Sequence, residues 1–304
     1  MPRKFCYQVY LDDDRYVFLQ DLSFSLYKEF LKVILDYNLP VVNFFINEVI
    51  RSCYVKSNFD FDPEKLDIID KSILLLAIKS YSVTADVTFK VACAETEKTF
   101  EFVVFVNDLI EFLKAANIKR EFNITDNIMS MHFKVPTTFE KYNIEQLIAG
   151  WLTHISYKDT VISDFSNTEF ISKLPVSVVS KFNKIFGEEN DKLTSKPIIT
   201  YKTPFSETVK PTNLYVSLLD DSLLNTIKLI FETDLLDLYE TEYFLIKDYN
   251  FTQDLFESKS PAEIFAYISI IGKYKERDDN TNNYSQTGPP PAAPFTDEGG
   301  LENL

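Results

Sequence analysis

The chain has 304 residues, of which 45% are hydrophobic, so it can bury one large core or two smaller ones. Its formal net charge is −15 at pH 7, and a surface of that sign repels phosphate backbones, which argues against a nucleic-acid partner. The sequence shows no signal-peptide core and no apolar run near the roughly 20 residues that span a bilayer. These features predict a cytosolic protein with no membrane partner.

The residue types that most often bind metals or act in catalysis are scarce. Cys6, Cys53 and Cys93 are far apart and show no C-x-x-C spacing, and His132 and His154 are the only histidines. A zinc site built from these side chains would require folding to gather nearly all of them. We therefore predict buried thiols that behave as small apolar groups, a structural histidine on a strand at 132, and another on a helix at 154.

Motifs that carry catalytic chemistry are absent from the sequence. None of the glycine-rich phosphate loops, the G-x-S-x-G elbow or the H-E-x-x-H zinc motif occurs. The acidic run at residues 12–14 lacks the glycine and glutamate of a calcium loop, so a solvated turn is predicted there. We predict no catalytic residue, cofactor or metal, hence no enzyme. The alternative is an enzyme of unrecognised type, with a carboxylate-lined cleft around His132 or His154.

In the N-terminal half, stretches of period-two alternation are mixed with stretches of helical period. The alternation predicts a hairpin at residues 5–19 and two further hairpins, at 86–106 and 119–135. A polar loop is predicted at 56–64. Helices are predicted at residues 24–37, 40–54, 67–80 and 108–116. The helix at 67–80 is apolar nearly all round, which predicts that it lies in the centre of the domain.

The C-terminal half reads as mainly helical. Residues 140–188 are predicted to be helical, with Gly187 ending a helix near 176–186, and residues 188–213 to be an irregular connection. Further helices are predicted at residues 222–249 and 260–276.

The residues from 279 onward are of low complexity and rich in proline, glycine and acidic side chains, which predicts an extended or disordered tail. Phe295 and Leu301 are its candidate partner-binding residues, and the alternative is a plain tail.

The pattern as a whole predicts an α+β protein, mostly helical, with two β-hairpins in the N-terminal half and a disordered C-terminal tail. The expected domain boundaries are an N-terminal α+β domain over residues 1–136, a helical domain over 137–277 and a flexible tail over 278–304.

Two stretches resemble one protein family. The first has a helix at 45–53 that ends in Cys53, a Leu-Asp step into the apolar helix of 66–83, and a strand that ends in Cys93. The second runs from Tyr-Phe-Leu-Ile-Lys at 243–247 through Asp-Leu at 254–255 to Ser-Pro-Ala-Glu at 260–263. Together they resemble the hub assembly proteins of T4-type bacteriophage baseplates, with Lys79 where that family usually has an arginine.

The resemblance implies a structural or assembly protein of the phage tail baseplate hub that acts through protein–protein contacts with other hub or tail proteins. Its place would be the virion baseplate, or the host cytoplasm during assembly. The alternative function is a transient chaperone for a hub or tape-measure protein, absent from the mature virion, for which the high negative charge is suitable.

Overall fold

The computed structural model describes residues 6–93, 95–126, 129–141, 144–157, 160–163, 173–232 and 235–285, without the side chains of 144–145 and 276–285. The chain divides into two compact units, residues 1–262 and 263–304. The helices are α1 (Phe24–Asp36), α2 (Leu39–Cys53), α3 (Ile68–Ser82), α4 (Val106–Ala115), α5 (Ile144–Trp151), α6 (Val176–Thr194), α7 (Ser222–Phe231), α8 (Leu235–Tyr249), α9 (Gln253–Ser258) and α10 (Pro261–Ser285).

The strands form small antiparallel sheets, in the order β1-β2-β3, β4-β5, β6-β7-β8-β9 and β10-β11. They are β1 (Cys6–Tyr10), β2 (Tyr16–Gln20), β3 (Tyr54–Ser57), β4 (Asp86–Ala92), β5 (Thr99–Phe105), β6 (Glu121–Asp126), β7 (Met129–Lys134), β8 (Leu152–Tyr157), β9 (Thr160–Ile162), β10 (Ile199–Tyr201) and β11 (Thr212–Leu214). This arrangement confirms the predicted α+β class.

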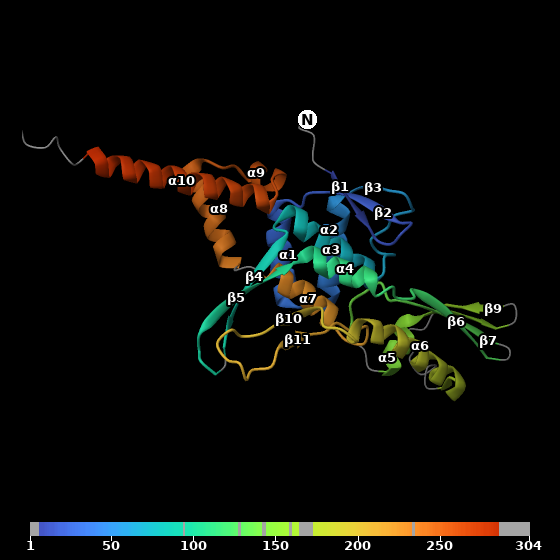
Figure 1. Cartoon of the computed structure of the whole chain (residues 1–304). Coiled ribbons are helices and arrows are strands. Elements are labelled where there is room, and N and C mark those ends of the chain that lie inside the picture. Colours follow the sequence, from blue (N-terminus) through green and yellow to red (C-terminus); the bar gives the residue numbers. More distant parts are fainter. Residues whose placement is uncertain are drawn as a thin grey trace, which may run out of the picture. The chain divides into compact units, whose positions relative to one another are not determined.

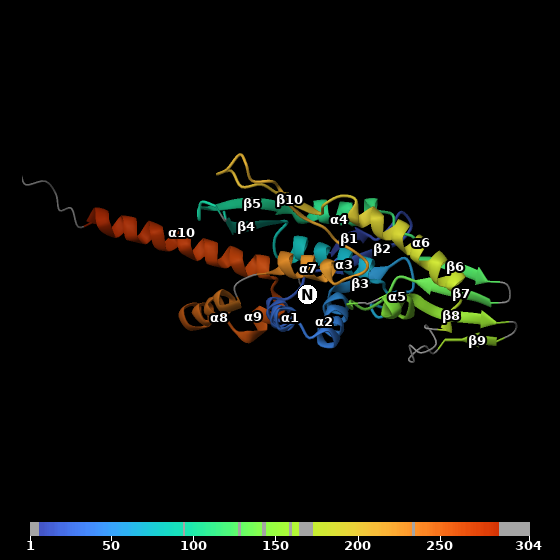
Figure 2. The ribbon, with the colours of Figure 1, turned by 90° about the horizontal axis from the view of Figure 1, so that it is seen from below.

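Helix α3 is the centre of the unit formed by residues 1–262. It packs against α2, α4 and α7, which surround it in both views (Figure 1, Figure 2). Nearly every side chain of α3 is buried, from Ile68 to Ser82, as its all-round apolar sequence predicted. The positions of these three helices are therefore set by how they cover α3.

The hairpins predicted from alternation are confirmed by the structure. Val9 lies opposite Val17 in the first hairpin, and both side chains are buried. The four-stranded sheet buries an aromatic cluster against α6, where the ring of Phe133 lies 4.9 Å from that of Phe182, and Trp151 and Phe122 pack around them. These contacts attach α6 to the β6-β7-β8-β9 sheet.

The β4-β5 hairpin lies beside β10-β11 in Figures 1 and 2. Its inner face carries Phe100 and Phe102, and the Phe102 ring stacks on that of Tyr201 at 4.5 Å between centroids. Phe205, between β10 and β11, makes an edge contact with Phe100. Aromatic stacking therefore joins two ribbons that are about a hundred residues apart in sequence.

The clearest error in the sequence prediction lies at residues 152–162, which were expected to be helical. Leu152 and Ile155 are buried in strand β8, which pairs with β7 and then with β9. His154 is consequently on a strand and not on a helix. The helix-like spacing of apolar residues in α5 continues into β8, and only the open edge of β7 determines that the chain becomes a strand there.

Other boundaries also differ from the prediction. Gly187 does not end a helix, because α6 continues to Thr194, and the connection expected to be irregular includes β10 and β11. The loop expected at 56–64 begins inside strand β3, and the helix expected over 222–249 is two helices, α7 and α8. Helix α10 extends to Ser285, beyond its predicted end. Phe295 and Leu301 lie outside the described residues.

Lys79 is a charged residue at the centre of the core. Its side chain is almost completely buried on α3, and its Nζ lies 5.5 Å from the ring centroid of Tyr27 and 5.7 Å from that of Phe231. The loss of water around the ammonium group lowers the pKa of Lys79 to about 8. The two rings compensate for only part of that loss, because a cation–π contact contributes about 0.5–2 kcal/mol.

Replacing this lysine with an apolar side chain of similar length is expected to stabilise the protein. Lys79→Met should raise the free energy of unfolding at pH 7 by about 1–3 kcal/mol, because a buried charge is removed while the packing is kept. The pKa of Lys79 is lower in the folded chain than its ordinary value of 10.5. The wild type therefore gains stability as the pH rises from about 8, and the advantage of the variant shrinks.

Urea unfolding of both proteins at pH 7 and pH 9.5 measures this difference. Lys65→Met is the control, because Lys65 is exposed and its replacement should change stability by less than about 0.5 kcal/mol. A Lys79→Met protein that is less stable than the wild type at pH 7 would contradict the prediction.

Candidate interaction site

The N-terminus of α3 carries two carboxylates that meet two arginines from distant segments. Asp67 caps the helix, because its Oδ1 accepts hydrogen bonds from the backbone N–H groups of Ile69 and Asp70, both at 2.9 Å. The same oxygen lies 2.8 Å from Nη1 of Arg120. Asp70 Oδ2 lies 2.9 Å from Nη1 of Arg15, and its Oδ1 lies 3.4 Å from Nη2 of Arg120. We call Arg15, Asp67, Asp70 and Arg120 the ionic cluster.

The turn between β1 and β2 holds Arg15 in place. Asp12 Oδ1 accepts hydrogen bonds from the backbone N–H groups of Asp14 (3.0 Å) and Arg15 (2.7 Å), and its Oδ2 lies 2.6 Å from the Arg15 Nε. Partial burial alone would raise the pKa of Asp12, but the hydrogen bonds from Arg15 and Asp14 hold it below its usual value. The acidic run is therefore an exposed turn that positions an arginine.

Burial dominates the electrostatics of the ionic cluster. The side chain of Asp70 is 1% exposed, and burial together with the nearby Asp67 raises its pKa to about 6, although Arg120 and Arg15 act in the opposite direction. The two arginines are about a quarter to a third exposed and bring positive charge to carboxylates that α3 places inside the protein. The cluster therefore ties the first hairpin and the β6-β7 sheet to one end of α3.

The segment after β7 is attached to the same end of the core. Lys71 Nζ donates a hydrogen bond of 2.5 Å to the carbonyl of Thr137, and burial lowers the pKa of Lys71 to about 8. The Asn43 side chain of α2 accepts from the Phe139 backbone N–H at 2.7 Å and donates to the Phe139 carbonyl at 2.9 Å. The chain between β7 and α5 is thus fixed by side chains from two helices.

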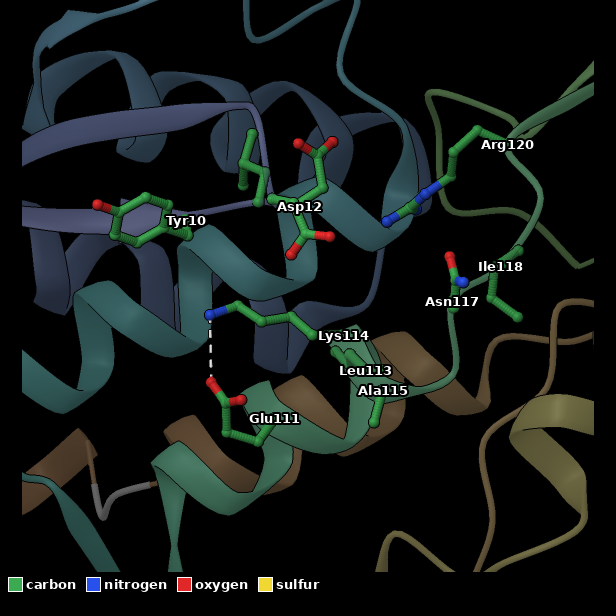
Figure 3. Close-up of a pocket in the computed structure, with 11 residues that line it drawn as sticks. Tyr10, Asp12, Glu111, Leu113, Lys114, Ala115, Asn117, Ile118 and Arg120 are labelled. Atoms are coloured by element: carbon green, nitrogen blue, oxygen red, sulfur yellow. Dashed lines mark hydrogen bonds and ion pairs between the residues drawn. The ribbon is translucent and has the colours of Figure 1, made fainter.

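A cavity of about 730 Å³ opens beside the cluster. Figure 3 shows Tyr10 and Asp12 of the first hairpin on one side and Arg120 on the other, with Lys114 of α4 in an ion pair with Glu111 at 3.2 Å. These charges are engaged within the protein, since Asp12 binds Arg15 and Arg120 binds Asp67.

The two histidines, which sequence reasoning placed on different kinds of element, lie directly opposite each other on β7 and β8. Their rings stack with centroids 4.9 Å apart. The His132 Nδ1 lies 2.7 Å from the Asn123 Oδ1, and its Nε2 lies 3.6 Å from the Glu121 Oε2. The Thr153 hydroxyl donates a hydrogen bond to the His132 carbonyl at 3.0 Å and lies 3.3 Å from the His154 Nδ1. The pair is thus a cross-strand contact on the face of a sheet.

Within the part of the chain that the structure describes, no three histidine, cysteine, aspartate or glutamate side chains gather as they would around a metal ion. The thiols form no disulfide with one another. Cys53 and Cys93 are buried as predicted, whereas Cys6 is exposed, because it occupies an outward position on the edge strand β1. No helix among the described residues is long and apolar enough to cross a membrane.

Exposed apolar side chains mark further surfaces. Phe44 on α2 is 60% exposed, and Val103 and Phe105 point outward from β5. Large exposed apolar groups on neighbouring positions are typical of protein contacts. The amino-acid sequence alone does not show that these residues are exposed, because periodicity shows which residues share a face but not whether another element covers that face.

The family model for the T4 bacteriophage base plate protein matches residues 7–214 of this chain. The match covers the ionic cluster, the cavity and all the strands from β1 to β11. This protein therefore belongs to the T4 bacteriophage base plate protein family. Comparison with curated proteins gave no match, and neither did comparison with solved structures.

Loss of one arginine from the ionic cluster should destabilise the protein more than loss of an arginine on the surface. Arg120→Met is expected to lower the free energy of unfolding by about 2–4 kcal/mol at pH 8, because Asp67 and Asp70 remain buried with one guanidinium fewer. The variant also raises the pKa of Asp70 further. Because a raised folded-state pKa favours the protonated folded form, the destabilisation should be smaller at pH 5 than at pH 8.

Arg51→Met is the matched control, since Arg51 pairs with Glu48 and Glu64 at the surface and should contribute less than about 1 kcal/mol. Urea titrations at the two pH values provide the measurement. Equal losses for Arg51→Met and Arg120→Met would show that the cluster is not a core element.

Proposed function

We propose that this protein takes part in building the central hub of the phage tail baseplate, through protein–protein contacts with other hub or tail proteins. The family membership of residues 7–214 is the observation that carries the proposal. That the site of action is the hub is inferred from the resemblance to hub assembly proteins. The two stretches that carry this resemblance correspond to the segment from α2 to β4 and to α8, α9 and the start of α10. The place of action would be the virion baseplate, or the host cytoplasm during assembly.

The described surface supports a role in protein–protein contacts. Asp12, Glu111, Lys114 and Arg120 at the cavity are each paired within the protein, and the histidines stack on each other across two strands. Exposed aromatic residues such as Phe44 and Phe105 provide apolar contact area at low side-chain entropy cost. A net charge of −15 favours protein partners over nucleic acid.

The experiment that tests this proposal is quantitative mass spectrometry of purified virions, compared with lysates in which baseplate assembly is blocked. We expect the protein in virions at a fixed ratio to a known baseplate protein, because a hub component stays in the particle. A chaperone for a hub or tape-measure protein would instead appear only in the blocked lysate, bound to its client. Absence from both samples would contradict the proposal.

A further inference from the structure

Strand β4 forms one edge of the β4-β5 ribbon, which extends away from α3 in both views (Figure 1, Figure 2). The ladder between the two strands continues from a hydrogen bond of 3.0 Å between the Val106 N–H and the Ala85 carbonyl. Bonded pairs alternate along an antiparallel ladder, so the odd-numbered residues of β4 bond to β5. The backbone N–H and C=O groups of Asp86, Thr88 and Lys90 therefore point away from β5, toward the open edge.

The open edge of β4 has backbone groups without partners. Among the described residues, no hydrogen bond reaches the backbone groups of Thr88 or Lys90. Those of Asp86, in the same part of the chain, contact only the Thr84 hydroxyl, at 2.9 Å from the carbonyl oxygen and 3.4 Å from the nitrogen. The β10-β11 ribbon stacks on the inner face of β4-β5 and forms a sheet of its own, so it does not pair with this edge. Unpaired backbone groups along an edge strand are a template for another strand.

The outer side chains of β4 are self-complementary in charge. Asp86 and Lys90 lie two residues before and two residues after Thr88, and all three are exposed on the outer face. If a second β4 runs antiparallel with the two Thr88 residues opposite each other, Asp86 of each copy lies opposite Lys90 of the other. Registers centred on Asp86 or on Lys90 would place like charges opposite each other, and the registers between them place no opposite charges directly across from each other. The charges therefore favour a single register.

Both charges are available to a partner strand. Asp86 has no cationic partner among the described residues, since its carboxylate contacts only the Thr84 hydroxyl. Lys90 lies 3.6 Å from Glu101 of β5 in an ion pair whose side chains are 74% and 58% exposed, so it is held only weakly. On the inner face, the same register places Val87 of each copy opposite Phe89 of the other. The added strand thereby continues the apolar inner face of the ribbon.

The other edge of the ribbon has no such symmetry. The outer side chains of β5 are Thr99, Glu101, Val103 and Phe105, of which only Glu101 is charged. A β5 that pairs with its own copy therefore gains no ion pair in any register. The ribbon fits a second copy through β4 and not through β5.

We propose that β4 pairs with the β4 of a second copy of this chain, antiparallel and centred on Thr88. The two ribbons then form one four-stranded sheet in the order β5-β4-β4-β5, with a two-fold axis between the Thr88 residues. Each copy contributes only the short segment 86–90, so a dissociation constant of about 10–100 µM is expected. This inference goes beyond the proposed function, because self-association through β4 does not depend on a role in the hub.

Sedimentation velocity of the full chain between about 5 and 200 µM tests the proposal. The wild type should show a reversible monomer–dimer equilibrium. Thr88→Pro should weaken the dimer by at least about tenfold, because proline lacks the N–H at the centre of the pair and its ring blocks the edge. The bonds to β5 are kept, since the Thr88 N–H takes no part in them. Val103→Pro is the matched control. Val103 lies directly opposite Thr88 with its N–H at the other edge, so this variant should dimerise like the wild type.

Two charge variants test the register. Asp86→Lys and Lys90→Glu should each weaken their own dimer about tenfold, because each places two like-charge pairs across the two-fold axis. An equimolar mixture of the two should associate with a dissociation constant within about threefold of the wild-type value. In that mixed pair, each lysine of the Asp86→Lys chain lies opposite a carboxylate of the Lys90→Glu chain. The mixture is measured at about 150 mM salt, which screens the general attraction between chains of different net charge.

Circular dichroism should show the wild-type helix and strand content in each variant. A wild type that stays monomeric at about 200 µM, above the expected dissociation constant, would overturn the proposal. So would a mixture that associates no better than its two components, or a Val103→Pro chain that dimerises as poorly as Thr88→Pro. Growth beyond a dimer would overturn it as well, since a two-fold pair is closed.

Discussion

A helix that is apolar on nearly every side is stable in water only when other elements cover all of it, and α3 imposes that requirement on the whole of this protein. Helices α2, α4 and α7 each take one side of it. The first sheet and the β6-β7-β8-β9 sheet are then attached through the N-terminal end of the helix, where Asp67 and Asp70 are buried. Few arrangements of the neighbouring elements both cover the apolar sides of α3 and pair the buried carboxylates at its N-terminal end. Helix α3 therefore determines the fold more than any other element.

Burying the charged residues of α3 costs free energy, and their need for charged or polar partners restricts how other segments can pack against the helix. Asp67 and Asp70 require the guanidinium groups of Arg15 and Arg120, and Lys71 requires the Thr137 carbonyl. Each of these contacts forms only when the segment that carries the partner lies in one position. An apolar surface, in contrast, can be covered by a segment in several positions. A buried ionic group is weak evidence for stability, but a set of partners from separate segments restricts the number of alternative packings.

The sequence predicted the features of this fold that depend on local pattern. The alternation in the hairpins and the all-round apolar run of α3 were sufficient to identify them. His154 was assigned to the wrong kind of element because only pairing with β7 makes residues 152–157 a strand, and Gly187 remains helical because packing of α6 on the sheet outweighs the low helix propensity of glycine. The ionic cluster could not be predicted, since Arg15, Asp67 and Arg120 show no common period in the sequence. The acidic N-cap of α3 was the only local signal of that cluster.

The position of α7 in the sequence affects the newly made chain. Helix α3 ends at Ser82, whereas α7, which covers one of its sides, begins at Ser222. At a synthesis rate of about 5–20 residues per second, a ribosome takes on the order of ten seconds or more to make the residues in between. During that interval an apolar side of α3 has no partner within the nascent chain. Because transiently exposed apolar surface promotes aggregation, the nascent chain is open to aggregation through this side of α3 until α7 has been made.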